Sequence, residues 1–143
     1  MGDGVRIYKI DGVPYTGMVS EARDRSFYEN GVATGKWLTF YQDGNIKSIE
    51  NWKAGKLNGK YILYGKNRKK TIEEYYTDGI DNGIYLIFHD NGVPYIVGSF
   101  KNGKPSGKWL YYDSHGKLYG NNDFTGEQGT LKSTTIPKKK STK

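Results

Sequence analysis

The stretch GKWLTFYQDG at residues 35–44 returns 72 residues later as GKWLYYDSHG at residues 107–116. Self-similarity of this kind is tested first, because a repeat fixes the whole architecture. Three glycine columns keep a spacing of 24 residues: Gly35, Gly59, Gly83 and Gly107; Gly31, Gly55, Gly79 and Gly103; and Gly44, Gly92 and Gly116, with Arg68 in the fourth slot. The chain is therefore built from 24-residue units.

Aromatic residues follow the same period. They form three columns: Trp37, Tyr61, Tyr85 and Trp109; Phe40, Tyr64, Phe88 and Tyr112; and Trp52, Tyr76, Phe100 and Phe124. These columns hold 12 of the 21 aromatic residues of the chain. The repeat therefore determines where most of the aromatic residues lie.

Each unit predicts one β-hairpin. In the first regular unit, KWLTFY and IKSIENW are rich in aromatic and β-branched residues and flank the turn sequence QDGN. Asp43-Gly44, Asn91-Gly92 and His115-Gly116 predict type I′ turns, which need positive φ at both central residues. The segment from Gly55 to Gly59 and its copies predict a second short loop. The expected fold is all-β: an elongated antiparallel meander of 24-residue hairpins in a single curled sheet.

Side-chain alternation divides the first strand of each unit into two faces. One face is apolar in every unit and is expected to be the buried ladder: Leu38 and Phe40, Ile62 and Tyr64, Leu86 and Phe88, Leu110 and Tyr112. The other face, which starts with Trp37, Thr39 and Tyr41, is mixed and is expected to be partly exposed to water.

Composition indicates one domain with a thin core. The 143 residues are 35% hydrophobic and include no Cys, which excludes disulfides and Cys-based chemistry. Residues 1–131 are predicted to form the repeat domain, with regular repeats over about 28–126 and an irregular N-terminal cap over 1–27. Residues 132–143 predict a basic, disordered tail, and removing its five lysines lowers the net charge from +7 to +2. No apolar run is long enough for a membrane span, so a cytoplasmic protein is expected.

No residue pattern indicates catalysis, and neither a cofactor nor a metal is expected. His89 and His115 occupy different positions in their repeats. No glycine-rich stretch is followed by the Lys-Ser or Lys-Thr pair that a phosphate-binding loop needs. The protein is therefore expected not to be an enzyme.

The rings are the candidate contact surface for another protein. A single-layered sheet cannot hide both faces, so we predict partner binding by Trp37, Tyr41, Tyr61, Tyr85, Trp109 and Tyr111. The alternative is that these rings only form the hydrophobic ladder of the sheet. Lys138, Lys139 and Lys140 are the candidates for contact with nucleic acid or an anionic membrane.

The glycine-framed unit, with its Asp-Gly or Asn-Gly turn and a second strand that ends in an aromatic residue, resembles the MORN-variant repeat. PYTG at residues 14–17 and YENG at residues 28–31 also resemble the opening unit of the YwqK-like antitoxin family. This resemblance implies a protein-binding module with an antitoxin-like role, in which the protein neutralises a toxin or effector. Two alternatives stay open: a mobile-element inhibitor of a bacterial immune nuclease, and surface association through the Lys-rich tail.

Overall fold

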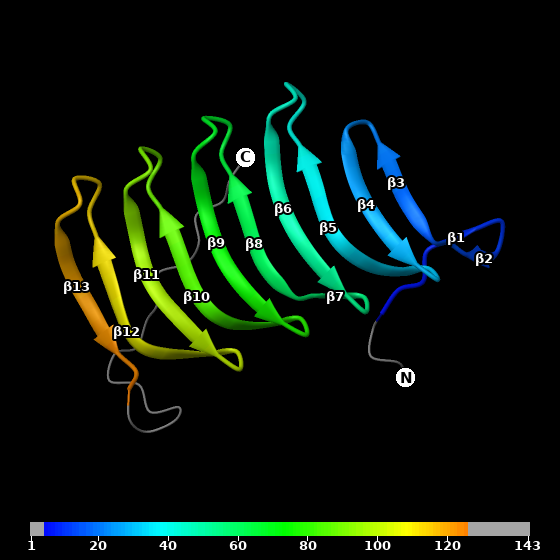
Figure 1. Cartoon of the computed structure of the whole chain (residues 1–143). Helices are drawn as coiled ribbons and strands as arrows, with labels where there is room; N and C mark the ends of the chain where they lie inside the picture. The colour runs from blue at the N-terminus through cyan, green and yellow to red at the C-terminus, as the bar shows by residue number, and fades with distance from the viewer. Residues whose placement is uncertain (1–4, 126–143) are drawn as a thin grey trace.

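The structure is a computed structural model that describes residues 5–125. Eleven strands form one open antiparallel sheet, in the order β13-β12-β11-β10-β9-β8-β6-β5-β4-β3 with β7 paired to β6 (Figure 1). The two shortest strands at the N-terminal end, β1 and β2, form a separate pair. The expected all-β antiparallel meander is confirmed. The strands are β1 (Lys9–Ile10), β2 (Val13–Pro14), β3 (Gly17–Glu21), β4 (Asp24–Glu29), β5 (Val32–Phe40), β6 (Ile46–Lys53), β7 (Lys56–Leu57), β8 (Gly59–Tyr64), β9 (Lys70–Thr77), β10 (Ile80–Phe88), β11 (Pro94–Lys101), β12 (Lys104–Tyr112) and β13 (Leu118–Asp123).

Each 24-residue unit is one hairpin, as predicted. The pairs are β5–β6, β8–β9, β10–β11 and β12–β13, all antiparallel. In each hairpin the register shifts by one residue just before the turn, which leaves one residue of the second strand as a β-bulge. The bulged residues are themselves 24 apart: Lys47, Thr71, Tyr95 and Tyr119.

The predicted type I′ turns at Asp43-Gly44, Asn91-Gly92 and His115-Gly116 are wrong. Only the glycine of each pair has positive φ. The Tyr41 N–H donates to the Asn45 carbonyl and the Gly44 N–H to the Tyr41 carbonyl, so three residues form the loop. This is a type I turn followed by one left-handed residue. Arg68 fills the same left-handed position with φ 67°, although it is not glycine.

Positive φ at two consecutive central residues occurs instead at the opposite end of the sheet. Ala54-Gly55 has φ values of 50° and 80°, and Asp78-Gly79 and Asn102-Gly103 are nearly identical. The predicted loop from Gly55 to Gly59 is therefore a two-residue turn that leads straight into the next strand. Gly83 lies where the β9–β10 register shifts between Asp81 and Tyr85, with φ 126°. The strands curve at this end of the sheet (Figure 1).

This curvature reverses the predicted burial of the two faces. We call the face that carries Trp37, Tyr61, Tyr85 and Trp109 the inner face, and the other the outer face. Tyr85, Ile87 and Trp109 are 5%, 1% and 0% exposed, whereas Leu86, Phe88 and Leu110 of the outer face are half-buried. The expectation of a buried ladder on the Leu38 face is thus wrong, apart from Ile62 at 7%.

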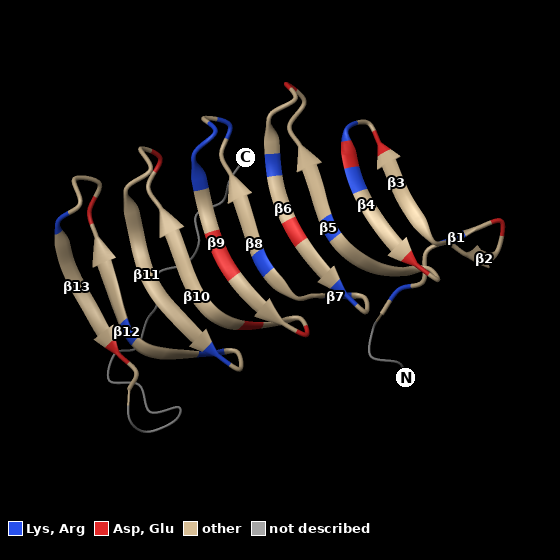
Figure 2. Ribbon diagram, viewed as in Figure 1, with Lys and Arg blue, Asp and Glu red and all other residues tan. Residues whose placement is uncertain are grey.

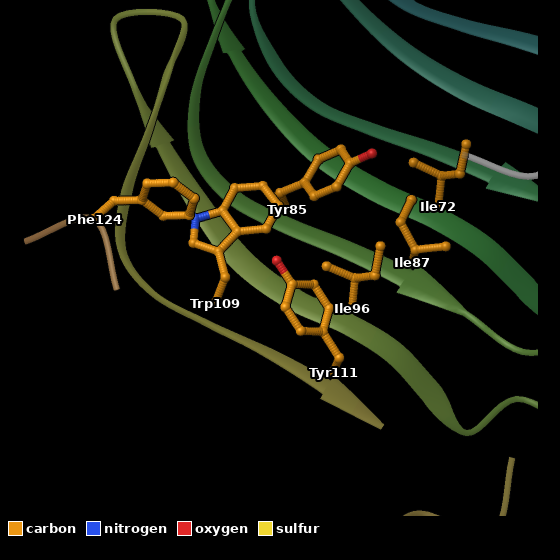
Figure 3. Packing of buried hydrophobic residues seen from close by; sticks show 7 residues of the cluster. All are labelled: Ile72, Tyr85, Ile87, Ile96, Trp109, Tyr111 and Phe124. Atoms are coloured by element: carbon orange, nitrogen blue, oxygen red, sulfur yellow. The ribbon is translucent and has the colours of Figure 1, made fainter. Parts of the chain in front are cut away.

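Ring geometry gives the physical reason. Phe100 meets Tyr85 and Trp109 edge to face, with both centroid distances at 5.1 Å and interplanar angles of 90° and 88°. Phe124 meets Trp109 in the same way at 5.9 Å and 80°. Rings from the two sides of each bend thus close on the inner face. Figure 3 shows the resulting core on one side of the sheet: Ile72, Tyr85, Ile87, Ile96, Trp109, Tyr111 and Phe124.

Successive units are also joined by hydrogen bonds at both ends of the sheet. The N–H groups of Gly55, Gly79 and Gly103 donate to carbonyls of the preceding unit at 2.9, 2.7 and 2.8 Å. At the other end, the Tyr41 hydroxyl donates to the Tyr64 carbonyl at 2.7 Å, and His89 Nε2 lies 2.8 Å from the Tyr112 carbonyl oxygen. His89 therefore has a structural contact of its own.

Candidate functional site

Two copies of a three-ring arrangement lie at the two ends of the inner face. The C-terminal copy is Phe100, Trp109 and Phe124, and the N-terminal copy, three units earlier, is Tyr28, Trp37 and Trp52. The two copies differ in how far their tryptophan is buried, and this difference shows which ring surface is accessible to a ligand.

The C-terminal copy is sealed. Trp109 is fully buried, and its indole Nε1 donates to the Ser99 carbonyl at 3.1 Å. Its ring lies flat on Gly98: a Cβ at Gly98 would lie 2.5 Å from Cε2 and 2.7 Å from Cε3 of Trp109. Only a residue without a side chain permits this approach.

The N-terminal copy is open. Trp37 makes the corresponding bonds, with Nε1 3.0 Å from the Thr34 carbonyl and 3.2 Å from that of Phe27, yet its ring is only half-buried. The residue in phase with Gly98 is Ser26. Because Ser26 carries a side chain, Trp37 lacks the bare backbone on which Trp109 lies. The Trp37 indole is tilted by 31° against Trp52 at a centroid distance of 4.8 Å.

A cavity of about 490 Å³ lies against these open rings. The segment before β1 forms one wall. Tyr8 stacks on Tyr28 at 4.5 Å and 18°, and its N–H donates to the Gly31 carbonyl at 2.6 Å. The lining consists of Arg6, Ile7 and Tyr8 from this segment, together with Tyr28, Ala33, Trp37, Trp52 and Gly55. The four rings give the cavity apolar surface, and Arg6 adds a charged side chain to its lining.

The six predicted contact residues divide into two groups. Trp37, Tyr41 and Tyr61 are half-buried, whereas Tyr85, Trp109 and Tyr111 are 5%, 0% and 6% exposed. The expectation that the whole row is open is wrong for the second group, because the bends close over it. A partner can reach these three rings only if the core opens, so the candidate site shrinks to the N-terminal half of the inner face.

Tyr41 lies at the rim of that half, near the three-residue turns. The ammonium groups of Lys47 and Lys66 lie 5.8 and 5.9 Å from its ring centroid, within cation–π range. Its hydroxyl is engaged with the Tyr64 carbonyl. The ring is therefore already covered in part by two lysines, and its open surface is smaller than that of Trp37.

Burial, with a further contribution from nearby carboxylates, raises the pKa values of the central tyrosines. Burial raises the pKa of Tyr61, and the charges of Glu50 and Glu74 raise it further. Burial, Glu74 and Asp81 likewise raise the pKa values of Tyr76 and Tyr85. None of these phenols is activated as a nucleophile or base. They contribute apolar surface and neutral hydroxyls.

The outer face has a separate ion-pair cluster. Glu73 accepts a hydrogen bond from Lys70 at 2.9 Å and one from the Tyr75 hydroxyl at 3.3 Å, and Lys60 lies 4.0 Å away. Burial raises the pKa of Glu73, but the hydrogen bond and charge of Lys70, together with the charge of Lys60, outweigh burial and leave the pKa below its ordinary value. The lysines make Glu73 a structural anion and not a general base.

Sequence reasoning missed part of the site. Tyr8 and Arg6 lie outside the repeat, so no periodic signal marks them. Tyr28 and Trp52 are in phase, and the match of Tyr28, Trp37 and Trp52 to Phe100, Trp109 and Phe124 is the signal that would have identified them. Lys138, Lys139 and Lys140 lie outside the described residues, so their predicted role stays a prediction.

Within residues 5–125 no three His, Asp or Glu side chains are placed to hold a metal ion. The same range contains no helix that is long and apolar enough to cross a membrane.

Comparison with known proteins identifies the repeat. A family model described as MORN repeat variant matches residues 33–54 and 81–102. Both segments start two residues after a turn glycine and end at the next turn of the same kind, and they lie two periods apart. No curated protein matches the chain. Membership of the YwqK-like antitoxin family stays a prediction. Two of the 24-residue units are thus similar to the MORN repeat variant, a repeat of the protein- or lipid-binding class.

Proposed function

We propose that the protein is a non-enzymatic, cytoplasmic binding module that holds another protein at the N-terminal half of its inner face. The observation that carries this proposal is the difference between the two three-ring copies. Trp109 is sealed, whereas Trp37 faces a cavity of about 490 Å³. Tryptophan and tyrosine beside a concave apolar surface are the residue types that dominate protein interfaces.

The remaining surface supports the same choice. The outer face carries half-buried aliphatic residues, but its central part is occupied by the Glu73 cluster and its two lysines. The C-terminal half of the inner face is filled by its own rings. In the N-terminal half, large aromatic surface and a cavity coincide.

Binding that covers a partner's active surface would make the protein an antitoxin-like inhibitor, the role that the resemblance implies. Inhibition of a bacterial immune nuclease by the same surface is the alternative. Co-expression distinguishes them: rescue of growth from a toxin encoded beside the gene favours the first, and loss of nuclease-based defence favours the second.

The test of partner binding uses a cavity-filling variant. Ala33 lines the cavity and is 8% exposed, so Ala33→Ile reduces the space without removing a ring. Ile84→Ala on the outer face, at a side chain that is 50% exposed, is the matched control. Affinity capture from the native host should recover a protein with wild-type and Ile84→Ala baits and lose it with Ala33→Ile. Equal recovery with all three baits would contradict the proposed site.

A further inference from the structure

Charged side chains on the strands of the eleven-stranded sheet are divided unequally between its two faces. The strand registers place five acids at inner positions: Glu21, Asp24, Glu50, Glu74 and Asp81. They place three acids and nine bases at outer positions, and these bases include Lys36, Lys53, Lys60 and Lys108. The remaining base on these strands is Lys47, the bulged residue of β6 beside Tyr41. The inner face is therefore acidic and the outer face basic.

Charges outside these strands leave the division intact. The turns between strands β3 and β13 carry four acids, one of them Asp78, and five bases, among them Lys66 and Arg68. The segment before β3 carries Arg6, Lys9 and Asp11 within the described residues. Both sets are nearly balanced, so the excess of acid belongs to the inner positions of the strands.

Three of the inner acids lie on the middle strands. We call Glu50, Glu74 and Asp81 the central acids, and Figure 2 shows red segments that include them on β6, β9 and β10. Glu74 lies opposite Tyr61, and Asp81 lies opposite Tyr76. Glu50 and Asp81 are half-buried and so remain accessible to a cation, whereas Glu74 is 1% exposed and adds its negative charge to the same surface.

The outer face shows how this chain holds a lysine between an acid and a ring. Lys60 Nζ lies 5.7 Å from the Tyr75 ring centroid and 4.0 Å from Glu73. On the inner face, the half-buried rings of Tyr61 and Tyr76 have centroids 6.4 Å apart beside the central acids. Cation–π and Coulomb attraction therefore both favour an ammonium group there.

The chain itself contains a segment with the complementary charge. Residues 132–143, which lie outside the described residues, contain five lysines and no acid. The sheet order makes four strand spacings from β13 to β9 and six from β13 to β6, which correspond to about 19 and 29 Å. An extended chain spans about 23 Å from Thr125 to Lys132 and about 43 Å from Thr125 to Lys138. These lysines can therefore reach the central acids.

We propose that residues 132–143 fold back over the inner face, with their lysines on Glu50, Glu74 and Asp81 and beside the rings of Tyr61 and Tyr76. The tether favours this segment over a basic segment of another chain, because a short tether gives an effective concentration in about the millimolar range. The inference is independent of the proposed function, because none of these residues lines the cavity beside Trp37.

The test is paramagnetic broadening of amide signals in the full chain. The chain has no Cys, so Ser141→Cys provides a single site for a nitroxide label. The amide signals of β6, β8 and β9 should be broadened more than those of the other strands, and they should recover when the nitroxide is reduced. Added salt should also reverse the broadening, because the contact is electrostatic and partly exposed.

Two charge-matched triple variants of the labelled chain separate the two faces. The broadening should be lost with Glu50→Gln, Glu74→Gln and Asp81→Asn. It should persist when three outer acids are replaced instead, in Glu29→Gln, Glu73→Gln and Asp123→Asn. Circular dichroism checks that each variant keeps its sheet. If the buried Glu74→Gln change disrupts folding, the double variant Glu50→Gln, Asp81→Asn should still weaken the broadening.

Three results would overturn the proposal: no selective broadening of β6, β8 and β9, equal broadening in both triple variants, or broadening that is insensitive to salt. Added pentalysine provides a further comparison. If pentalysine shifts the β6 and β9 signals while the label has no effect, the inner face takes a basic segment of another chain, and the assignment to residues 132–143 is wrong. None of these results decides the proposed function, which is tested by protein capture with Ala33→Ile.

Discussion

Replacement of Gly98 by alanine tests whether Trp109 is buried because its indole packs directly on the Gly98 backbone. A Cβ at this position would lie 2.5–2.7 Å from two carbons of the Trp109 indole and closer still to a third. Trp109 is fully buried between Tyr85, Phe100 and Phe124, so its ring has no free space to move into. The added methyl group must therefore displace the ring or the strand.

The size of the effect follows from two opposing terms. Overpacking a well-filled core costs about 1–3 kcal/mol. Replacing glycine by alanine also reduces the conformational entropy of the unfolded chain, which restores about 0.5–1 kcal/mol. We expect Gly98→Ala to lower the free energy of unfolding by about 1–2 kcal/mol. A complete loss of the packing of Trp109 would cost about 3–5 kcal/mol and sets the upper limit.

Gly120→Ala is the matched control. Gly120 also lies in a strand, its φ is not left-handed, and a Cβ there would meet Tyr111 Cδ2 at 3.7 Å, an ordinary contact. Urea unfolding followed by circular dichroism and tryptophan fluorescence should show Gly120→Ala at or above wild-type stability. If Gly98→Ala proves as stable as Gly120→Ala, Trp109 does not rest on the Gly98 backbone and the explanation of the sealed copy is refuted.

Three further predictions concern single contacts. Arg68→Gly should raise the free energy of unfolding by about 0.5–1 kcal/mol in urea, since it relieves a left-handed residue, and an unchanged or lower value would contradict the turn geometry. Tyr41→Phe should lower the free energy of unfolding by about 0.5–1.5 kcal/mol through loss of the bond to the Tyr64 carbonyl, whereas Tyr112→Phe, without a described hydroxyl bond, is the comparison. The stability advantage of the wild type over Glu73→Gln should be complete above about pH 5 and vanish as the pH falls through the lowered pKa of Glu73. If the stability advantage of the wild type over Glu73→Gln instead grows as the pH falls, the pKa of Glu73 is not lowered by folding.

The 24-residue period was sufficient to predict the hairpins of the regular units, their antiparallel order and the approximate positions of their turns. Those features depend on where the backbone turns, and the glycine columns mark these positions in the sequence. Turn type was not predictable in the same way. Asp43-Gly44 fits both a two-residue type I′ turn and a three-residue turn that ends in a left-handed glycine, and only the hydrogen bonds from Tyr41 and Gly44 decide between them.

The buried face was predicted wrongly for a physical reason. Both faces of the first strands carry large apolar or aromatic side chains, so alternation alone does not choose between Leu86 and Tyr85. The choice is made by the bend at Gly83 and its equivalents, which brings Phe100 over Tyr85 and Trp109. The choice of buried face is thus a long-range consequence of backbone geometry, and it cannot be predicted from amino-acid composition.

The open site was only half predictable. Trp37 belongs to a column and was expected to take part in binding, but the cavity depends on Tyr8 and Arg6 from a segment outside the repeat. The in-phase exchange of Gly98 for Ser26 is visible in the sequence. Its meaning emerges only when Trp109 is seen to lie on Gly98.

The central claim is that equivalent tryptophans are open at one end of the inner face and sealed at the other. Acrylamide quenching measures this most directly in two single-tryptophan variants, one that keeps Trp37 and one that keeps Trp109, with the other two tryptophans replaced by phenylalanine. Trp37 should be quenched readily, while Trp109 should resist quenching. Equal quenching of the two indoles would contradict the account.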